Sequence, residues 1–226
     1  APASSRWNPA ARDLAILIGL ALLMFAAGLG LRDPWPADEP RFALIARDMV
    51  ETGRWLFPVI GGDYYADKPP LCFWIMATCY ALTGSLRVAF LLPSLLAALA
   101  VVVLVYDLAR RLWNREAAFG AAMLLLFTVA FAWQARAAQI DMTVTAFITL
   151  ALYGLLRHLL VKSSWLWYAI AGFAAGLGVI TKGVGFLPLL ALIPYGVMRS
   201  RRWPLPPVGK GGWRWSLAPI AMLAAI

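Results

Sequence analysis

The chain has 226 residues, of which 62% are hydrophobic and only 14% are charged, and its formal net charge is +9 at pH 7. A soluble domain is about half apolar and about a quarter charged, so this composition excludes an ordinary soluble protein. The apolar residues form long runs separated by short basic clusters, which is typical of a protein that crosses a membrane several times. The positive charge is therefore interpreted as a topology signal and not as a nucleic-acid-binding surface.

Six apolar runs of 15 to 19 residues are interpreted as membrane spans, since flanking residues bring them close to the ~20 residues that a span needs. No small-residue cleavage site follows the first run, which is therefore predicted to be a signal anchor. Because the chain starts without methionine and ends inside an apolar run, we expect residues 1–226 to be the N-terminal part of a single, longer transmembrane domain. The predicted spans are 14–31, 88–106, 117–133, 142–160, 165–180 and 184–198, with a partial span at 216–226.

A further apolar run, 71–83, has only 13 residues and covers about 20 Å of a hydrocarbon core about 30 Å thick. If it does not cross, 12 basic and 3 acidic residues lie inside, which satisfies the positive-inside rule. Counting alone leaves the alternative open, because a crossing run with the N-terminus outside places still more basic residues inside. The short length and the preceding Lys68-Pro69-Pro70 favour a run that stays on one side. We therefore predict an external loop over 32–87.

This external loop is predicted to carry two helices that lie along the membrane surface or dip into it. The first spans about 40–52, follows the acidic pair Asp38-Glu39, and is ended by Gly53. The second starts at the proline pair 69–70 and ends at Gly84.

Two charged motifs in the loop have both a structural and a functional interpretation. Asp38-Glu39 could simply stabilise a helix N-terminus, although two adjacent acids with Arg41 close behind are more than this needs. Asp67 and Lys68 could neutralise each other in an interfacial turn. Alternatively, Lys68 could bind a phosphate, with Asp67 as its orienting partner or as a metal ligand. Spacing alone leaves both interpretations open.

Two further charged residues lie on the same predicted face of the membrane. Asp141 could cap the span 142–160. Lys182 lies in a tight turn, where a lysine can snorkel and stays close to lipid phosphates. Together with the loop, these residues place four acids and three bases in one water–lipid boundary zone. Such a zone could hold a lipid phosphate and activate an acceptor.

These residues resemble the first periplasmic loop of the GT-C glycosyltransferases, the protein O-mannosyltransferase superfamily. The resemblance is greatest to the bacterial branch that includes the aminoarabinose transferases acting on lipid A. Asp67 stands where these transferases usually have glutamate, and Phe42 stands where tyrosine is common. The matching pieces run in family order over nearly the whole chain: Asp38-Glu39-Pro40-Arg41-Phe42, Gly53-Arg54-Trp55, Tyr65-Ala66-Asp67-Lys68-Pro69-Pro70-Leu71, 87–93, Gln139-Ile140-Asp141-Met142-Thr143 and 178–183.

The resemblance implies an all-α fold, a polytopic transmembrane helical bundle of GT-C type with juxtamembrane helices in the first external loop. It implies that Asp38 orients or deprotonates the acceptor and that basic residues hold the phosphate of the donor. The implied site residues are, by role, catalytic Asp38, Glu39 and Asp141; donor-phosphate-binding Arg41, Lys68 and Lys182; and substrate-site Tyr65 and Asp67.

The function implied is sugar transfer from a polyprenyl-phosphate donor to an envelope acceptor, such as lipid A or a protein, at the periplasmic face of a bacterial inner membrane. Membrane lipids are expected partners, and nucleic acid is not. No cofactor is predicted, and a divalent metal ion stays open. Two alternatives also stay open: a transporter or flippase of lipid-linked sugars, and a non-catalytic membrane subunit.

Overall fold

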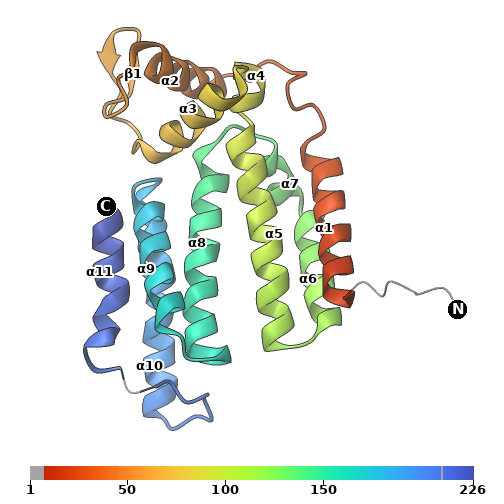
Figure 1. Ribbon diagram of the computed structural model, residues 1–226, viewed down its shortest axis with the longest axis vertical. Coiled ribbons are helices and arrows are strands. Elements are labelled where there is room, and N and C mark those ends of the chain that lie inside the picture. Colours follow the sequence, from red (N-terminus) through yellow and green to blue (C-terminus); the bar gives the residue numbers. More distant parts are fainter. Residues whose placement is uncertain (1–7, 210) are drawn as a thin grey trace, which may run out of the picture.

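The computed structural model describes residues 8–209 and 211–226 and is almost entirely helical. Long helices stand side by side in a bundle, and a layer of shorter elements lies across one end of it (Figure 1). In chain order the elements are α1 (Pro9–Phe25), α2 (Asp38–Thr52), β1 (Val59–Ile60), β2 (Asp63–Tyr64), α3 (Leu71–Thr83), α4 (Leu86–Ala89), α5 (Leu92–Leu112), α6 (Arg115–Leu126), α7 (Val129–Ala135), α8 (Ile140–Leu156), the π-helix η1 (Arg157–Val161), α9 (Trp165–Val179), the 3-10 helix η2 (Gly183–Ala191), α10 (Leu192–Ser200), the 3-10 helix η3 (Gly212–Ser216) and α11 (Leu217–Ala225).

The layer at the end of the bundle is formed by the segment predicted as the external loop. Helices α2 and α3 both lie in this layer and pack together through Phe42 and Phe73, whose ring centroids are 5.4 Å apart. Each helix ends at a glycine in the left-handed region, Gly53 at φ 72° and Gly84 at φ 63°. Glycine adopts this conformation without the steric cost of a Cβ atom. The loop also contains a short antiparallel hairpin of β1 and β2, which the prediction of two helices did not include.

Helix α1 is displaced along the chain from the predicted span 14–31. It starts earlier because the Asn8 side chain accepts a hydrogen bond from the Ala10 N–H at 3.1 Å, which caps the helix. It stops at Phe25 because the chain then turns through Gly28 and Gly30, at φ 88° and 76°. Residues 26–31 therefore connect the bundle to the layer.

The predicted span 117–133 is broken into α6 and α7, which meet at an angle of 68°. The Thr128 hydroxyl donates to the Leu124 carbonyl at 2.8 Å, a contact four residues back that is known to bend helices. Thr128 itself has an extended backbone. The apolar composition of the run carried no sign of this break.

The predicted span 184–198 starts as the 3-10 helix η2 and continues as α10. Its start packs directly on α9, since a Cβ atom on Gly185 would lie only 2.0 Å from the carbonyl carbon of Gly178. This close approach holds the turn that contains Lys182. By length and composition, Leu86–Leu112, Ile140–Val161 and Gly183–Ser200 can each cross a membrane, and α6 with α7 makes a fourth if the bent pair is one span.

A buried ion pair joins three helices at the opposite end of the bundle from the layer. The carboxylate of Asp13 on α1 accepts hydrogen bonds from Arg115 Nε at 2.6 Å and Nη2 at 2.7 Å, and from the Tyr106 hydroxyl at 2.8 Å. The Asp13 side chain is only 6% exposed. Arg110 and Arg111 in the last turn of α5 add basic charge at this end, which the sequence predicts to be the inside face.

Thiol labelling tests whether α3 stays on one side of the membrane. We expect Asp63→Cys and Thr83→Cys, which precede and end α3, to react with a membrane-impermeant maleimide from the same side. The control Lys162→Cys should react only from the other side. The native Cys72 and Cys79 are buried, and burial raises the pKa of Cys72 to about 12, so they add little background. Reaction of the two loop cysteines from opposite sides would show that α3 crosses.

Candidate active site

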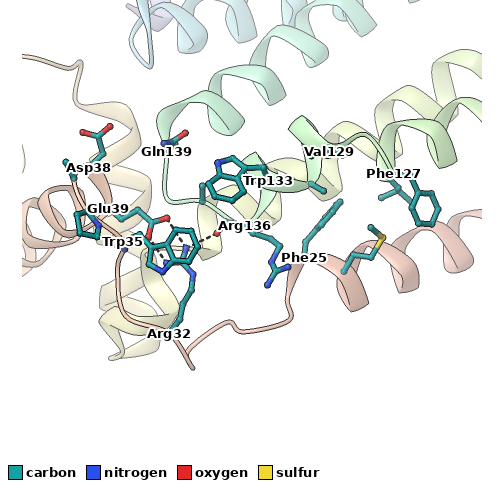
Figure 2. Close-up of a pocket in the computed structure, with 16 residues that line it drawn as sticks. Phe25, Arg32, Trp35, Asp38, Glu39, Phe127, Val129, Trp133, Arg136 and Gln139 are labelled. Atoms are coloured by element: carbon teal, nitrogen blue, oxygen red, sulfur yellow. Dashed lines mark hydrogen bonds and ion pairs between the residues drawn. The ribbon is translucent and has the colours of Figure 1, made fainter.

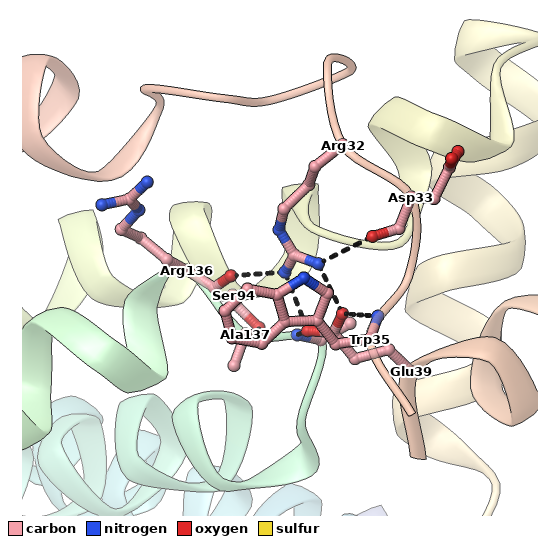
Figure 3. Close-up of polar contacts among 8 residues, drawn as sticks. Arg32, Asp33, Trp35, Glu39, Ser94, Arg136 and Ala137 are labelled. Carbon is pink, nitrogen blue, oxygen red and sulfur yellow. Dashed lines mark hydrogen bonds and ion pairs between the residues drawn. The ribbon is translucent and has the colours of Figure 1, made fainter. Parts of the chain in front are cut away.

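Glu39 in the first turn of α2 is buried, with 6% of its surface exposed. Its Oε1 accepts hydrogen bonds from Arg32 Nη2 at 2.9 Å and from the Ala138 N–H at 2.8 Å. Its Oε2 accepts hydrogen bonds from Arg32 Nη1 at 2.6 Å and from the Trp35 N–H at 2.7 Å (Figure 3). A carboxylate has about four acceptor positions, so protein groups use the full capacity of this one.

The protonation state of Glu39 follows from the same contacts. Burial by itself would raise its pKa, but the Arg32 guanidinium and the two backbone N–H groups outweigh burial and hold the pKa below its ordinary value. A carboxylate that stays ionised and is fully hydrogen-bonded to the protein is a poor proton carrier. The catalytic role expected for Glu39 therefore does not fit its environment, whereas a role in holding its neighbours does.

Asp38 differs from its neighbour, because its side chain is 51% exposed. Its Oδ1 lies 3.3 Å from Arg41 Nη2, one turn along α2. The Arg41 Nη1 in turn lies 3.5 Å from the hydroxyl of Tyr65, a buried residue just before α3. Arg41 is 34% exposed and has five N–H donors, so it keeps donors free for a ligand such as a phosphate.

Asp141 and Lys182 form a second charged pair at this end of the bundle. Lys182 Nζ lies 2.6 Å from Asp141 Oδ1, although the residues are 41 positions apart. Asp141 comes from the first turn of α8, and Lys182 comes from the turn between α9 and η2. Both side chains are close to half exposed, at 42% and 45%, so the pair faces outward and can be reached by a ligand.

Asp67 and Lys68 are exposed in the segment that leads into α3. Within the part of the chain that the structure describes, they form no ion pair with each other or with another side chain. The mutual neutralisation considered from the sequence is therefore not seen. Lys68 presents a free ammonium group at the end of the bundle where the other expected site residues lie.

A cavity of about 760 Å³ opens beside Asp38 (Figure 2). Asp38 and Gln139 lie at one end of it, and Phe127 lies at the other. The rings of Trp35 and Trp133 are 5.8 Å apart along its wall. Of the expected site residues, only Asp38 and Glu39 line the cavity. Asp38 therefore lies between this cavity and the Arg41–Tyr65 contact on the other side.

The sequence interpretation gave no role in the site to Arg32, Trp35 or Arg136, which surround Glu39 or line the cavity. Arg32 ends the first apolar run and was counted only as a charge of the loop. Its partner Glu39 is seven residues away across a non-helical segment, so no helical spacing signals the pair. Arg32 and Glu39 also contact residues 136–138, which lie more than 90 positions away in the sequence. No local sequence pattern indicates these contacts.

Metal binding was left open by the sequence. In residues 8–209 and 211–226, no group of three or more His, Cys, Asp or Glu side chains is arranged to hold a metal ion. A metal ligand was one of two roles left open for Asp67, and the described residues supply no ligand set for it. Arg41, Lys68 and Lys182 are basic side chains at this end of the bundle that are exposed enough to meet an anion.

Comparison with solved structures identifies the class of the fold. The chain has a TM-score of 0.81 and 27% identity to the crystal structure of ArnT from Cupriavidus metallidurans bound to undecaprenyl phosphate, covering 94% of this chain and 39% of that one. An oligosaccharyltransferase from Archaeoglobus fulgidus in the apo form shares the fold at a TM-score of 0.69 and 16% identity. The bundle with its layer of juxtamembrane helices is therefore that of the GT-C membrane glycosyltransferases, which confirms the expected fold class.

Sequence comparison then gives the family. The profile of the dolichyl-phosphate-mannose-protein mannosyltransferase family matches residues 67–223, and the chain belongs to this family. It is 36% identical over 196 residues to undecaprenyl phosphate-alpha-4-amino-4-deoxy-L-arabinose arabinosyl transferase 1 of Pseudomonas fluorescens, covering 83% of this chain and 35% of that protein. It is 33% identical over 196 residues to the corresponding transferase of Pseudomonas aeruginosa, covering 84% and 35%. The chain spans about a third of the length of these relatives.

Proposed function

We propose that this chain forms the donor-phosphate side of the active site of a membrane glycosyltransferase. The full-length protein would move a sugar from a polyprenyl-phosphate donor to an envelope acceptor such as lipid A or a protein. One observation carries the proposal: Asp38–Arg41 and Asp141–Lys182 lie at the same end of the bundle, where Lys68 is exposed and has no ion-pair partner among the residues that the structure describes. The names of the related transferases support the donor class, since they include undecaprenyl phosphate.

In the proposed reaction, the bond between the anomeric carbon of the sugar and the donor phosphate oxygen breaks. The bonding electrons leave with the polyprenyl phosphate, and Arg41, Lys68 and Lys182 stabilise the growing negative charge. The acceptor oxygen bonds to the anomeric carbon. A hydroxyl acceptor gives its proton to Asp38, which acts as general base. A phosphate acceptor has no such proton to lose, and Asp38 then acts by placing it.

The proposed location is the bacterial inner membrane, with the layer of juxtamembrane helices on the periplasmic side. The apolar helices support a membrane protein, and the basic residues at the opposite end support this orientation. A polyprenyl chain would stay in the bilayer while its phosphate reaches the basic residues of the site. Lipid-linked donor and envelope acceptor would then meet at the same membrane face.

Transfer of labelled sugar tests the proposal directly. Membranes that contain the full-length protein should move the label from polyprenyl phosphate to a lipid or protein acceptor, and lipid A and other envelope glycans should change in mass when the gene is deleted. The substitution Lys68→Ala should raise the KM for the donor by about tenfold, because it removes one charge-assisted phosphate contact. The matched control Arg47→Ala removes an exposed basic residue paired with Glu51 and should leave the KM unchanged.

The transporter alternative has a different signature in the same assay. A transporter would move the lipid-linked sugar across the membrane without forming a glycosylated product. It would also be expected to place ionisable residues midway through its spans. The described charges Asp107 and Asp141 instead lie in the second half of α5 and in the first turn of α8. Transport of the donor without any product would overturn the proposed enzyme.

A further inference from the structure

We propose that the buried Arg32–Glu39 ion pair is a positioning device that holds Asp38 and the start of α8, with Asp141, in one arrangement. This inference rests on the proposed function for its effect on catalysis. The pair would act through Asp38 and Asp141, because protein donors already occupy the oxygens of Glu39 even though it lines the cavity. It joins the two sides of the candidate site, which come from distant parts of the chain.

The contacts of the pair reach both segments at once. On one side, Glu39 accepts the Trp35 N–H and sits directly beside Asp38 at the start of α2. On the other side, Glu39 accepts the Ala138 N–H at 2.8 Å, and Arg32 Nη2 donates to the Arg136 carbonyl at 2.9 Å. One ion pair therefore holds the backbone on both sides of the site.

The segment that leads into α8 is held at three successive residues. Arg136 is bound through its carbonyl by Arg32, and Ala138 is bound through its N–H by Glu39. Between them, the Ala137 carbonyl accepts a hydrogen bond from the buried Ser94 hydroxyl of α5 at 2.6 Å. Helix α8 starts two residues later, and Asp141 is its second residue. This anchoring fixes where α8 begins and so where Asp141 meets Lys182.

The chemistry of the pair requires both residue types. Glu39 needs two ionised oxygens, because each accepts one guanidinium N–H and one backbone N–H. Glutamine has an amide NH₂ group in place of one of these oxygens. That group only donates, so it could not accept the N–H groups that point at this position. Arg32 needs its planar fork to bind both oxygens and a carbonyl. Its guanidinium also lies 5.5 Å from the ring of Trp35 and 5.2 Å from that of Phe90, which keeps it in place.

The bundle contains a matched control for this pair. Asp13 and Arg115 form a similar buried, two-pronged ion pair at the opposite end, and it contacts none of the expected site residues. Breaking either pair should lower stability, because the buried carboxylates of Glu39 and Asp13 each accept several hydrogen bonds that an amide cannot all accept, although Arg115 itself is half exposed. Only the Arg32–Glu39 pair should affect catalysis in the protein that remains folded.

The experiment compares Glu39→Gln and Asp13→Asn in the purified full-length protein. Amide hydrogen exchange of peptides covering 33–40 and 134–142 should rise about tenfold or more in Glu39→Gln and stay at the wild-type level in Asp13→Asn. The kcat for transfer, per folded protein, should fall about 10²-fold in Glu39→Gln only, since small misplacements of catalytic groups cost this much. Binding of polyprenyl phosphate should stay at the wild-type level in Asp13→Asn and should weaken in Glu39→Gln by much less than kcat falls, because Arg41, Lys68 and Lys182 are retained and only the position of the Asp141–Lys182 pair changes.

Two further variants keep the test decisive if Glu39→Gln does not fold. Arg32→Lys keeps the charge and should retain more kcat than Arg32→Met, which keeps only the apolar stem. Wild-type exchange in 134–142 in Arg32→Met, or unchanged kcat despite raised exchange, would overturn the proposal. Equal kcat losses in the Arg32 or Glu39 variants and in Asp13→Asn would overturn it as well. Absence of transfer by the wild-type protein would sink the proposed function alone, and the exchange result would still decide whether the pair holds both segments.

Discussion

Replacing Asp38 by asparagine is expected to lower the kcat for transfer to a hydroxyl acceptor by about 10³-fold, within the range of about 10²–10⁴ that a general base contributes. The carboxylate is half exposed, lines the 760 Å³ cavity and lies 3.3 Å from the guanidinium of Arg41. It can therefore meet an acceptor on the cavity side while Arg41 meets the donor phosphate. Asparagine keeps the size of the side chain but cannot accept the proton, so the measurement is kcat with a labelled polyprenyl-phosphate sugar.

The acceptor and a neighbouring acid provide the controls for Asp38. With a phosphate acceptor, Asp38→Asn should cost only about tenfold, because no proton has to be removed and placement alone is lost. Asp33→Asn changes an exposed acid of the same connection, which is paired with Arg87, and should leave kcat unchanged. Wild-type kcat in Asp38→Asn with a hydroxyl acceptor would remove Asp38 from the catalytic residues.

Replacing Lys182 by glutamine is expected to lower kcat/KM by about 10²-fold to 10³-fold, the effect of losing one preorganised group that stabilises developing charge. Lys182 Nζ lies 2.6 Å from Asp141 Oδ1, and the pair is nearly half exposed. Without the lysine, the Asp141 carboxylate is left without its partner beside the donor phosphate and repels it. The loss should therefore exceed the effect of about tenfold expected for Lys68→Ala, which leaves no carboxylate of an ion pair behind.

A double-mutant cycle separates these two contributions. In Lys182→Gln/Asp141→Asn the uncompensated carboxylate is gone, so kcat/KM should recover by about tenfold relative to Lys182→Gln alone, as non-additivity between contacting residues predicts. The single Asp141→Asn should be impaired less than Lys182→Gln. Additive effects in the cycle would show that the 2.6 Å contact has no part in catalysis.

The parts of the fold that local signals predict are those in which neighbouring residues decide the structure. The ends of α2 and α3 follow from Gly53 and Gly84, which adopt a left-handed backbone. The short length of α3 also suggested a helix outside the bundle, and the structure has it in the layer. By contrast, the break between α6 and α7 depends on the hydrogen bond from the Thr128 hydroxyl to the Leu124 carbonyl. This contact lies inside an apolar run, so the hydropathy of the run does not predict it.

Composition and hydrophobic patterning alone determined that this is a membrane protein with a loop rich in charged residues at one end. The same reasoning treated Asp38 and Glu39 as equivalent acids, because adjacent carboxylates have the same local sequence. The family resemblance implied the acceptor role for Asp38, but only the tertiary structure gives the physical difference: Asp38 is exposed, and Glu39 is surrounded by Arg32 and the backbone of Trp35 and Ala138. Glu39 differs from Asp38 because it is buried and because it accepts a hydrogen bond from Ala138, nearly 100 residues away in the sequence. The spacing of the Asp38-Glu39 motif indicates neither of these facts.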